Sequence, residues 1–324
     1  MKETIAITGV TGHLGYNLVN FLLQEGYQVR ALIRSKQVPF IKDNLLWVHG
    51  DLTSADNLKT LLHQADTLIH CASLVSLNDL DKKNVYQINV VGTKTLIDLC
   101  EKHKIRMIHI SSSSVGRSAG PNEKFDESNP YIDDKYFYYA WTKAQSEKMV
   151  LSSVRNENLD ALIVRPTAII GPADPKPSPF GQTIFDIHLG KLSILTSGGY
   201  DLVDVRDLCQ TIIKSLTLGK KGEVYLIGGE YISIKKLAKL LKPKGFQLII
   251  PVDLLLLLLP LIKIYDRMFG LKWPITRESL HTLKYAPRHV NSSKAKQELH
   301  HVNRPIKTTL NDLIEWFNQK NKAL

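Results

Sequence analysis

Residues 4–26, TIAITGVTGHLGYNLVNFLLQEG, determine how the rest of the chain can be arranged. The apolar run ending at Thr8 is typical of a buried strand, and the amphipathic stretch from His13 is typical of a helix that ends near Gly26. Three glycines stand between or just inside these two elements: Gly9, Gly12 and Gly15. Glycines at these points permit a tight turn, close approach of the backbone to a phosphate, and close contact between helix and strand. The free N–H groups of the helix start suit a pyrophosphate, so the stretch predicts dinucleotide binding.

Strand-like and helical patterns alternate beyond this stretch. Strands are expected at 27–34, 44–52, 66–73, 105–114 and 159–171. Helices are expected at 54–65 and 85–103 and around Tyr139, with Ser54 or Asp56 as a cap and further helical material near 36–43. Such alternation requires right-handed crossovers and a parallel sheet covered on both faces. The predicted fold is therefore a doubly wound α/β fold of the Rossmann type.

A loop rich in proline and glycine, beginning at Gly171, marks a change in organisation. We assign residues 1–170 to a dinucleotide-binding domain, which we expect residues 203–228 to rejoin with one more helix and strand. Residues 171–202 and 229–324 are assigned to a smaller, mostly helical substrate-binding domain.

Composition and charge narrow the class of protein. With 324 residues, 44% of them hydrophobic and 23% charged, the chain has the composition of a soluble globular protein. The net charge of +11 lies entirely in the second half, because residues 1–160 hold 18 basic and 18 acidic side chains and residues 161–324 hold 24 and 13. No base-reading or stacking motif accompanies the charge, so nucleic-acid binding is not expected.

The cysteines and the N-terminus bear on location. Cys71, Cys100 and Cys209 are far apart, without metal-type spacing, as suits a reducing compartment. The sequence enters a strand pattern at once, without a signal peptide, and we expect a cytoplasmic protein that binds no metal.

The end of the second strand bears on the choice of dinucleotide. An acidic residue there would bind the ribose 2′-hydroxyl of NAD, whereas arginine accommodates the 2′-phosphate of NADP. The sequence has ALIRSK, with Arg34 and Lys36 and no acid. A charge-assisted arginine–phosphate pair favours NADP(H), with NAD(H) left open.

Residues 136–147, YFYYAWTKAQSE, hold the candidate catalytic pair. Side chains four residues apart lie on one face of a helix, which pairs Tyr139 with Lys143. A cation about 4 Å from a phenol is worth roughly 4 kcal/mol at an effective dielectric near 20. We therefore expect the lysine to lower the pKa of the tyrosine by about 3 units. Glu147 is expected to be an exposed helix partner of Lys143, contributing little.

Taken together, the glycine loop, the Y-x-x-x-K pair and the alternating elements resemble an extended short-chain dehydrogenase/reductase, closest in pattern to the dihydroflavonol reductase and 3β-hydroxysteroid dehydrogenase branch. The resemblance implies that Tyr139 is the catalytic acid and that Lys143 also binds the nicotinamide ribose. In HISSSSVG, the position of Val115 selects Ser112 as the catalytic serine, with Ser113 as the alternative. The family also implies a homodimer built on the Tyr139 helix.

The same resemblance implies a set of cofactor-binding residues. Asp51 and Leu52 correspond to the adenine contact, Ala72 and Ser73 to the end of the fourth strand, and Asn89 to a helix signature that could hold a relay water. Arg165-Pro166 opens a segment that passes the nicotinamide. The full set is Gly9, Thr11, Gly12, His13, Leu14, Gly15, Arg34, Asp51, Leu52, Ala72, Ser73, Asn89, Lys143, Pro166 and Ile169.

Three functions are compatible with these motifs. The favoured one is an NADP-dependent oxidoreductase that reduces a carbonyl, or oxidises the alcohol, of a small lipophilic molecule. An NAD-dependent sugar-nucleotide epimerase is the first alternative, although an acidic residue would be expected after its second strand. Dehydration is disfavoured, because Ser113-Ser114 stand where dehydratases carry Asp-Glu. A non-catalytic NADP-binding regulator is the second, although such proteins typically lose the Tyr–Lys pair.

A leucine-rich segment, 249–272, offers a clue to the substrate. It is too short to span a membrane and is interrupted by Asp253, Pro260 and Lys263. Either it is a buried helix of the small domain, or it is a lid or interfacial helix serving a lipophilic substrate. Between Lys235 and Lys272 there are 8 basic and 2 acidic residues, which suits weak contact with an anionic membrane surface.

Overall fold

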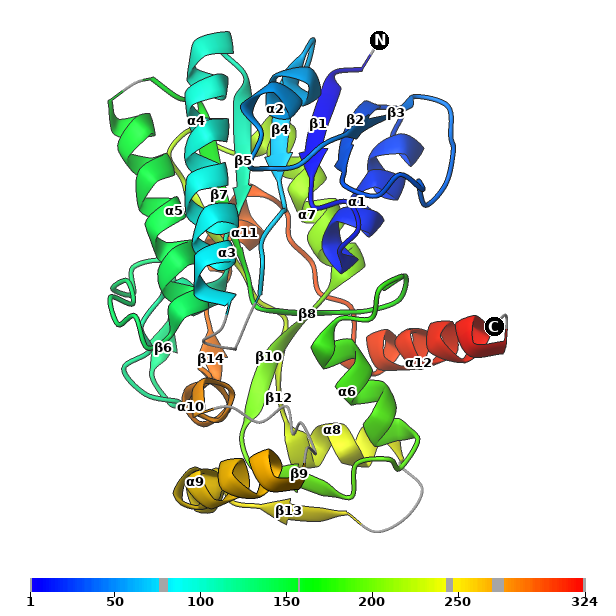
Figure 1. Ribbon diagram of the computed structural model, residues 1–324, viewed down its shortest axis with the longest axis vertical. Helices are drawn as coiled ribbons and strands as arrows, with labels where there is room; N and C mark the ends of the chain where they lie inside the picture. Colours follow the sequence, from blue (N-terminus) through cyan, green and yellow to red (C-terminus); the bar gives the residue numbers. More distant parts are fainter. Residues whose placement is uncertain (1, 76–80, 157, 243–246, 270–276, 323–324) are drawn as a thin grey trace.

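The central element of the protein is a seven-stranded sheet in which every strand pair is parallel. The computed structural model describes residues 2–75, 81–156, 158–242, 247–269 and 277–322 (Figure 1). The strand order is β3-β2-β1-β4-β5-β7-β11, which places a topological switch between β1 and β4. The strands are β1 (Thr4–Thr8), β2 (Gln28–Ile33), β3 (Leu45–His49), β4 (Thr67–His70), β5 (Arg106–Ile110), β7 (Ala161–Pro166) and β11 (Val224–Ile227). The predicted doubly wound α/β fold is confirmed.

Helices cover both faces of the sheet, and alternate strand residues divide between them. One core holds Ile5 and Ile7 with residues of α1 (His13–Gln24), α7 (Val205–Leu218) and α11 (Ser293–Glu298). The opposite core holds Ala6 and Leu68 with residues of α2 (Ala55–Leu62), α4 (Gly92–His103) and α5 (Tyr138–Arg155). Because successive side chains of a strand point to opposite faces, strands buried on both faces read as continuous apolar runs.

Several local predictions are refined by the structure. Ser54 caps α2 by accepting from the Asn57 N–H, and Gly26 follows α1 with φ of 81°, both as expected. The predicted 85–103 helix consists of α3 (Lys82–Tyr86), a π-helical turn η2 (Gln87–Val91) and α4. The predicted 159–171 strand breaks at Thr167 into β7 and β8 (Ala168–Ile170).

The prediction of helical material at 36–43 is wrong. These residues form bends and irregular backbone, without a helix. Phe40 packs edge-on against Tyr16 and Trp47, with ring centroids 5.6 Å away in each case, and its carbonyl accepts from the Trp47 indole at 2.8 Å. These tertiary contacts hold the segment in a non-helical path.

The remaining elements form a second layer below the sheet in Figure 1, and they include strands as well as helices. A three-stranded sheet has the order β12-β10-β8, with β10 (Gly199–Asp204) and β12 (Glu230–Ser233), and β9 (Ile194–Thr196) pairs with β13 (Leu248–Ile250). Two short strands, β6 (Lys124–Phe125) and β14 (His289–Val290), also pair. The helices are α6 (Pro179–His188), α8 (Ile234–Leu241), α9 (Val252–Phe269), α10 (Arg277–Tyr285) and α12 (Ile306–Lys322). Strand β11 returns to the main sheet beside β7, while the proposed domain boundaries stay a prediction.

In the described part of the chain, no helix combines the length and apolar character that crossing a membrane requires.

Candidate active site at the carboxyl edge of the sheet

The glycine loop after β1 is shaped by close backbone contacts. A Cβ on Gly9, whose φ is 78°, would lie 2.7 Å from the Ala72 nitrogen, and one on Gly15 would lie 2.3 Å from the Gly9 carbonyl oxygen. At Gly12 the nearest atom would be the Gly9 oxygen at 3.4 Å, so this residue faces open space. Gly12 is also the N-cap of α1 and has no side chain to satisfy the first-turn N–H groups. The loop therefore fits a dinucleotide, with donors and room where a pyrophosphate would bind.

The other residues predicted in this loop differ in accessibility. Thr11 is exposed, whereas the Leu14 side chain is in the core, so only the backbone of Leu14 is available to a cofactor. His13 Nε2 lies 3.1 Å from the Pro172 carbonyl, and burial lowers the pKa of this imidazole. Asn17 bonds to the same loop through the Ala173 carbonyl at 2.9 Å. The start of α1 is thus fixed to the segment that follows β8.

Arg34 and Asp51 lie together where β2 and β3 end. The Arg34 side chain is 74% exposed, with its Nε 4.0 Å from Asp51 Oδ2. Burial opposes ionisation of Asp51, but hydrogen bonds from Thr53 and the charge of Arg34 outweigh it and lower the pKa of Asp51. Leu52 packs in the core, so its predicted adenine contact is limited to backbone. The exposed guanidinium is available to an anion.

The end of β4 and the π-helical turn are tied together by Asn89. Its Nδ2 donates to the Leu74 carbonyl and to Thr142 Oγ1, both at 3.1 Å. Its Oδ1 accepts from the Leu74 N–H at 2.8 Å and from Ser73 Oγ at 3.1 Å. An amide side chain can take part in about four hydrogen bonds, two as donor and two as acceptor. All are used, so the prediction that the Asn89 side chain holds a relay water is not supported; it links β4 to α5 instead.

Tyr139 lies at the start of α5, partly buried. Burial of its hydroxyl raises the pKa of Tyr139 above the usual value, and a hydrogen bond with Ser73 acts in the opposite direction. The expectation that Lys143 lowers this pKa is therefore wrong for the structure as it stands. Tyr138 instead packs on Trp141, with ring centroids 5.5 Å apart, and Tyr136 is 44% exposed.

Lys143 is only 2% exposed and lies one helical turn beyond Tyr139. Its ammonium donates to the Ile110 carbonyl at 2.6 Å, at the end of β5. Burial lowers the pKa of Lys143 to about 8, and the nearby Glu147 carboxylate opposes this shift. The lysine ammonium is therefore held at the carboxyl end of the sheet, on the carbonyl of Ile110, which lies two residues before Ser112 in the chain.

The serines after β5 have separate roles. Ser111 Oγ donates to Glu147 Oε2 at 2.5 Å and is buried. Ser112 Oγ lies 2.9 Å from Ser114 Oγ and accepts from the Ser114 N–H at 3.2 Å, at the start of a single 3₁₀ turn (Ser113–Val115). The choice between Ser112 and Ser113 as the catalytic group stays a prediction.

Glu147 is completely buried, which contradicts the prediction of an exposed helix partner. It forms an ion pair with Arg165, whose Nε donates to it at 2.9 Å, and it also accepts from the Tyr131 hydroxyl at 2.8 Å. With the bond from Ser111, one carboxylate joins α5 to β5, to β7 and to the loop before α5. The i,i+4 spacing from Lys143 concealed this, because the partners come from distant segments.

The last predicted cofactor contacts lie at the end of β7. Pro166 is buried where β7 pairs with β11, and Ile169 of β8 is partly buried against the core. Asp207 is the last residue of the VDVRD motif at 203–207, and it accepts from the Arg304 N–H at 2.8 Å and from the Arg304 guanidinium. This motif thus holds the C-terminal segment.

Two histidines inside the sheet were not singled out by the sequence. His70 of β4 bonds to Thr8 at 2.7 Å and to Thr93 at 3.0 Å, and burial lowers its pKa to about 3. The His109 ring of β5 lies 5.4 Å from it, with both nitrogens buried and without a hydrogen-bond partner. Burial first, then the charge of Lys143, lowers the pKa of His109.

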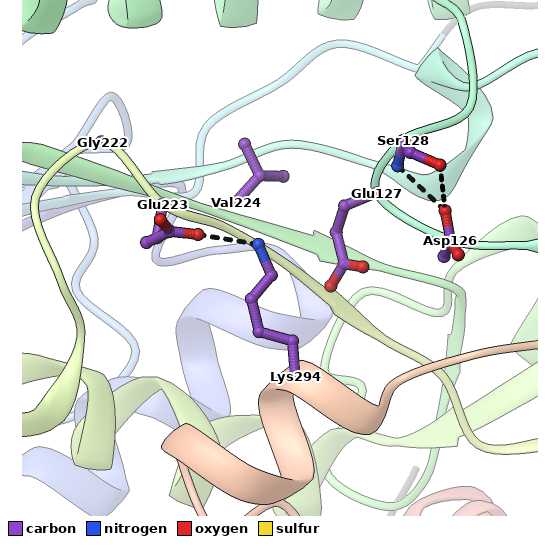
Figure 2. A pocket seen from close by; sticks show the side chains of 7 residues that line it. All are labelled: Asp126, Glu127, Ser128, Gly222, Glu223, Val224 and Lys294. Atoms are coloured by element: carbon purple, nitrogen blue, oxygen red, sulfur yellow. Dashed lines mark hydrogen bonds and ion pairs between the residues drawn. The ribbon is translucent and has the colours of Figure 1, made fainter.

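A surface hollow of about 460 Å³ lies elsewhere (Figure 2). Figure 2 shows Lys294 reaching across it to Glu223, at 2.8 Å. Glu127 there accepts from the Leu226 N–H at 2.9 Å. Because none of Ser112, Tyr139 and Lys143 lines it, it is separate from the candidate active site. Among the described residues, no cluster of three or more His, Cys, Asp or Glu could hold a metal.

A parallel sheet with this strand order, a glycine loop at its switch point and a Tyr–Lys helix alongside defines a class of nicotinamide-dependent enzymes. The chain belongs to the NAD dependent epimerase/dehydratase family, which matches residues 5–228. It is thus an extended short-chain dehydrogenase/reductase, as its sequence motifs indicated.

Individual relatives point to the same branch. The chain is 32% identical to sterol demethylase protein B of Methylococcus capsulatus, over 98% of this chain and 99% of that one. It is 32% identical to a putative dihydroflavonol 4-reductase of Synechocystis sp., over 98% and 95% of the two chains. A ketoreductase of Stigmatella aurantiaca, acting on 4-hydroxy-2-methyl-3-oxo-4-farnesyl-3,4-dihydroquinoline-1-oxide, is 31% identical over 74% and 73%. The crystal structure of gox2253 superposes with a TM-score of 0.85 at 28% identity, covering 99% of each chain.

Proposed function

We propose that the protein is an NADP(H)-dependent reductase of a lipophilic ketone. The observation that carries this proposal is the placement of Tyr139 and Lys143 on α5 beside the ends of β4 and β5, next to the glycine loop. The relatives named for sterol and farnesyl-quinoline chemistry support a lipophilic substrate.

In the proposed reaction, the nicotinamide supplies a hydride to the carbonyl carbon. Tyr139 donates its proton to the carbonyl oxygen, and Ser112, or Ser113 in its place, positions that oxygen. The raised pKa of Tyr139 keeps the phenol protonated at neutral pH, as a proton donor must be. The ammonium of Lys143 would hold the nicotinamide ribose, and its positive charge would stabilise the phenolate left when Tyr139 has given up its proton.

The catalytic assignment is tested with Tyr139→Phe, using Tyr138→Phe as the matched control. Reduction of a hydrophobic cyclic ketone by NADPH should fall about 10²–10⁴-fold in the first variant and remain near wild type in the second. Alanine at Ser112 and at Ser113 separates the two serines in the same assay. Equal loss in both tyrosine variants, or unchanged turnover in Tyr139→Phe, would refute the assignment.

The cofactor preference rests on the exposed Arg34 guanidinium. Loss of a hydrogen bond to a charged partner costs about 1.5–3 kcal/mol, or roughly 10–100-fold in affinity. Fluorescence titration should show tighter binding of NADPH than NADH, a difference removed by Arg34→Ala and kept in Lys36→Ala. Co-purification of tightly held NAD would instead favour the sugar-nucleotide epimerase.

A further inference from the structure

Helix α9 is apolar on two opposite faces. Its inner face, Val252, Leu255 and Leu259, is 5% exposed at each residue and packs with Leu280 of α10. A second apolar stripe faces solvent at intervals of three and four residues, the spacing of one helix face. Its members are Leu254 (44% exposed), Leu257 (75%), Leu258 (37%), Leu261 (64%), Ile264 (57%), Tyr265 (54%) and Met268 (72%).

Exposed apolar residues also occur on the strand pair that precedes α9. Ile194 of β9 and Leu248 of β13 are cross-strand partners, 50% and 47% exposed. Strand β13 leads directly into α9, and Figure 1 shows both at the lower end of the molecule. A run of exposed apolar side chains along one helix face, as on α9, marks an interaction site, because soluble proteins rarely leave such a surface uncovered.

The charge around the stripe identifies its partner. Lys235, Lys239 and Lys242 are exposed on or just after α8, at the same end of the molecule in Figure 1, and Lys263 is exposed on α9 itself. The acidic side chains described nearby are engaged, since Asp253 pairs with Lys284 and Glu230 with Lys236. An apolar stripe with basic flanks suits an anionic bilayer, whereas two copies of a basic end would repel each other.

We propose that the outer stripe of α9 docks on the surface of an anionic lipid bilayer, with the helix lying in the interfacial plane. Residues 270–272 of the predicted 249–272 segment lie outside the described residues. This membrane-docking role is separate from the proposed reductase activity, and it rests on the exposed residues of α9 and the lysines around them.

The docked face is connected to the catalytic helix through α10. The His281 ring of α10 lies 6.1 Å from Phe137 and 6.3 Å from Tyr136, immediately before α5. Leu280, its neighbour, packs beneath α9. If the proposed function holds, a lipophilic substrate leaving the bilayer enters beside Tyr139.

The test is co-sedimentation of the full-length protein with vesicles of phosphatidylcholine, with and without phosphatidylglycerol. Wild type should bind the phosphatidylglycerol vesicles, and less at high salt. The Leu257→Glu/Leu261→Glu variant should bind about 10-fold or more weakly. The matched control is Ile41→Glu/Val302→Glu, at residues 87% and 71% exposed elsewhere, which adds the same charge and should bind as wild type.

Three outcomes would overturn the proposal. The first is that wild type does not bind the vesicles at low salt. The second is that the control variant loses vesicle binding as much as the α9 variant does. The third is a wild-type dimer that becomes monomeric in the α9 variant while vesicle binding is unchanged. The last would assign the stripe to a second copy of the chain. NADPH titration and thermal melting establish that each variant is folded. Vesicle binding by Tyr139→Phe separates this proposal from the reductase activity, because that variant should bind lipid normally.

Discussion

Gly12 differs from the other two glycines of the loop in what surrounds it. A side chain at Gly9 or Gly15 would meet backbone atoms at 2.7 or 2.3 Å, whereas one at Gly12 meets only the Gly9 oxygen, at 3.4 Å. At Gly15 the protein's own backbone requires glycine, whereas no comparable contact requires it at Gly12. We therefore propose that a bound phosphate is what requires glycine at Gly12.

We predict that Gly12→Ala changes the free energy of unfolding by less than about 1 kcal/mol yet weakens NADPH binding, while Gly15→Ala destabilises by about 1–3 kcal/mol through overpacking. Urea unfolding and NADPH titration measure the two effects. Normal NADPH affinity in Gly12→Ala would show that no phosphate approaches this residue.

The Glu147 carboxylate holds several segments of the chain together through its hydrogen bonds and its ion pair. Glu147→Gln leaves the Arg165 guanidinium, with a side chain 4% exposed, without its counter-charge. Removing one partner of a buried ion pair costs about 3–5 kcal/mol. Urea unfolding should show this loss, with the exposed Glu123→Gln unchanged and partial recovery in Glu147→Gln/Arg165→Met. A loss below 1 kcal/mol would mean that the pair is hydrated.

The candidate catalytic pair could be proposed from the sequence, whereas the contacts that support the candidate site could not. Tyr139 and Lys143 lie on one helix, so a fixed spacing reports their proximity. The partners of Glu147 are Ser111, Tyr131 and Arg165, and no local spacing relates residues from three other segments.

Strands β4 and β5 bring two neutral imidazoles into the interior. Burial lowers the pKa of His70 to about 3 and that of His109 well below its usual value. In the unfolded chain both would bind a proton below about pH 6.5. The unfolded state therefore holds more protons in acid, and stability is lost as the pH falls below about 6.5, at up to roughly 1.4 kcal/mol per pH unit for each histidine.

His109→Leu should make this pH dependence shallower by one bound proton, because it removes one titrating imidazole. The substitution breaks no hydrogen bond of the His109 ring, since both ring nitrogens lack a partner. Urea unfolding between pH 7 and pH 5 measures the slope, with His63→Gln, an exposed histidine, as the control. Identical slopes in His109→Leu and wild type would mean that His109 is protonated in the folded protein. His13 and His301, whose pKa values are also lowered by burial, contribute equally to both proteins.

The elements themselves could largely be predicted, because strands buried on both faces produce uninterrupted apolar runs. The exceptions have tertiary causes. Phe40 and Trp47 hold the 36–43 segment away from helical geometry, and the π-helical turn places Asn89 where it can join β4 to α5. Neither arrangement leaves a periodic signal in the sequence.

At the level of the whole molecule, a group of ionic contacts joins the C-terminal segment to α7, the helix that packs on one face of the main sheet. Arg304 bonds to Asp207 of α7, and Arg206 bonds to Asp312 of α12 at 2.6 Å. Arg304→Gln leaves the buried Asp207 with unmet hydrogen bonds, at a cost of about 1–3 kcal/mol. Limited proteolysis should then cut near residue 300 earlier than in wild type or in the exposed Arg288→Gln control. Equal protection would contradict this role.

The charge asymmetry and the leucine run were evident from the sequence, but their meaning depended on the assembled molecule. Periodicity alone could not decide whether the run is buried or exposed, and the structure has one face of each kind. That division depends on where α10 packs, which is a tertiary fact.

The return of β11 to the main sheet constrains how such a gene can recombine. The chain leaves the sheet after β7 at Pro166 and re-enters it at Val224, and these two strands are direct neighbours. A single crossover between two homologous genes anywhere in residues 171–223 would pair β7 of one parent with β11 of the other, although these two buried strands pack directly against each other. Exchanging the segment between these two strands while keeping the sheet of one parent therefore requires two crossover points, one after β7 and one before β11.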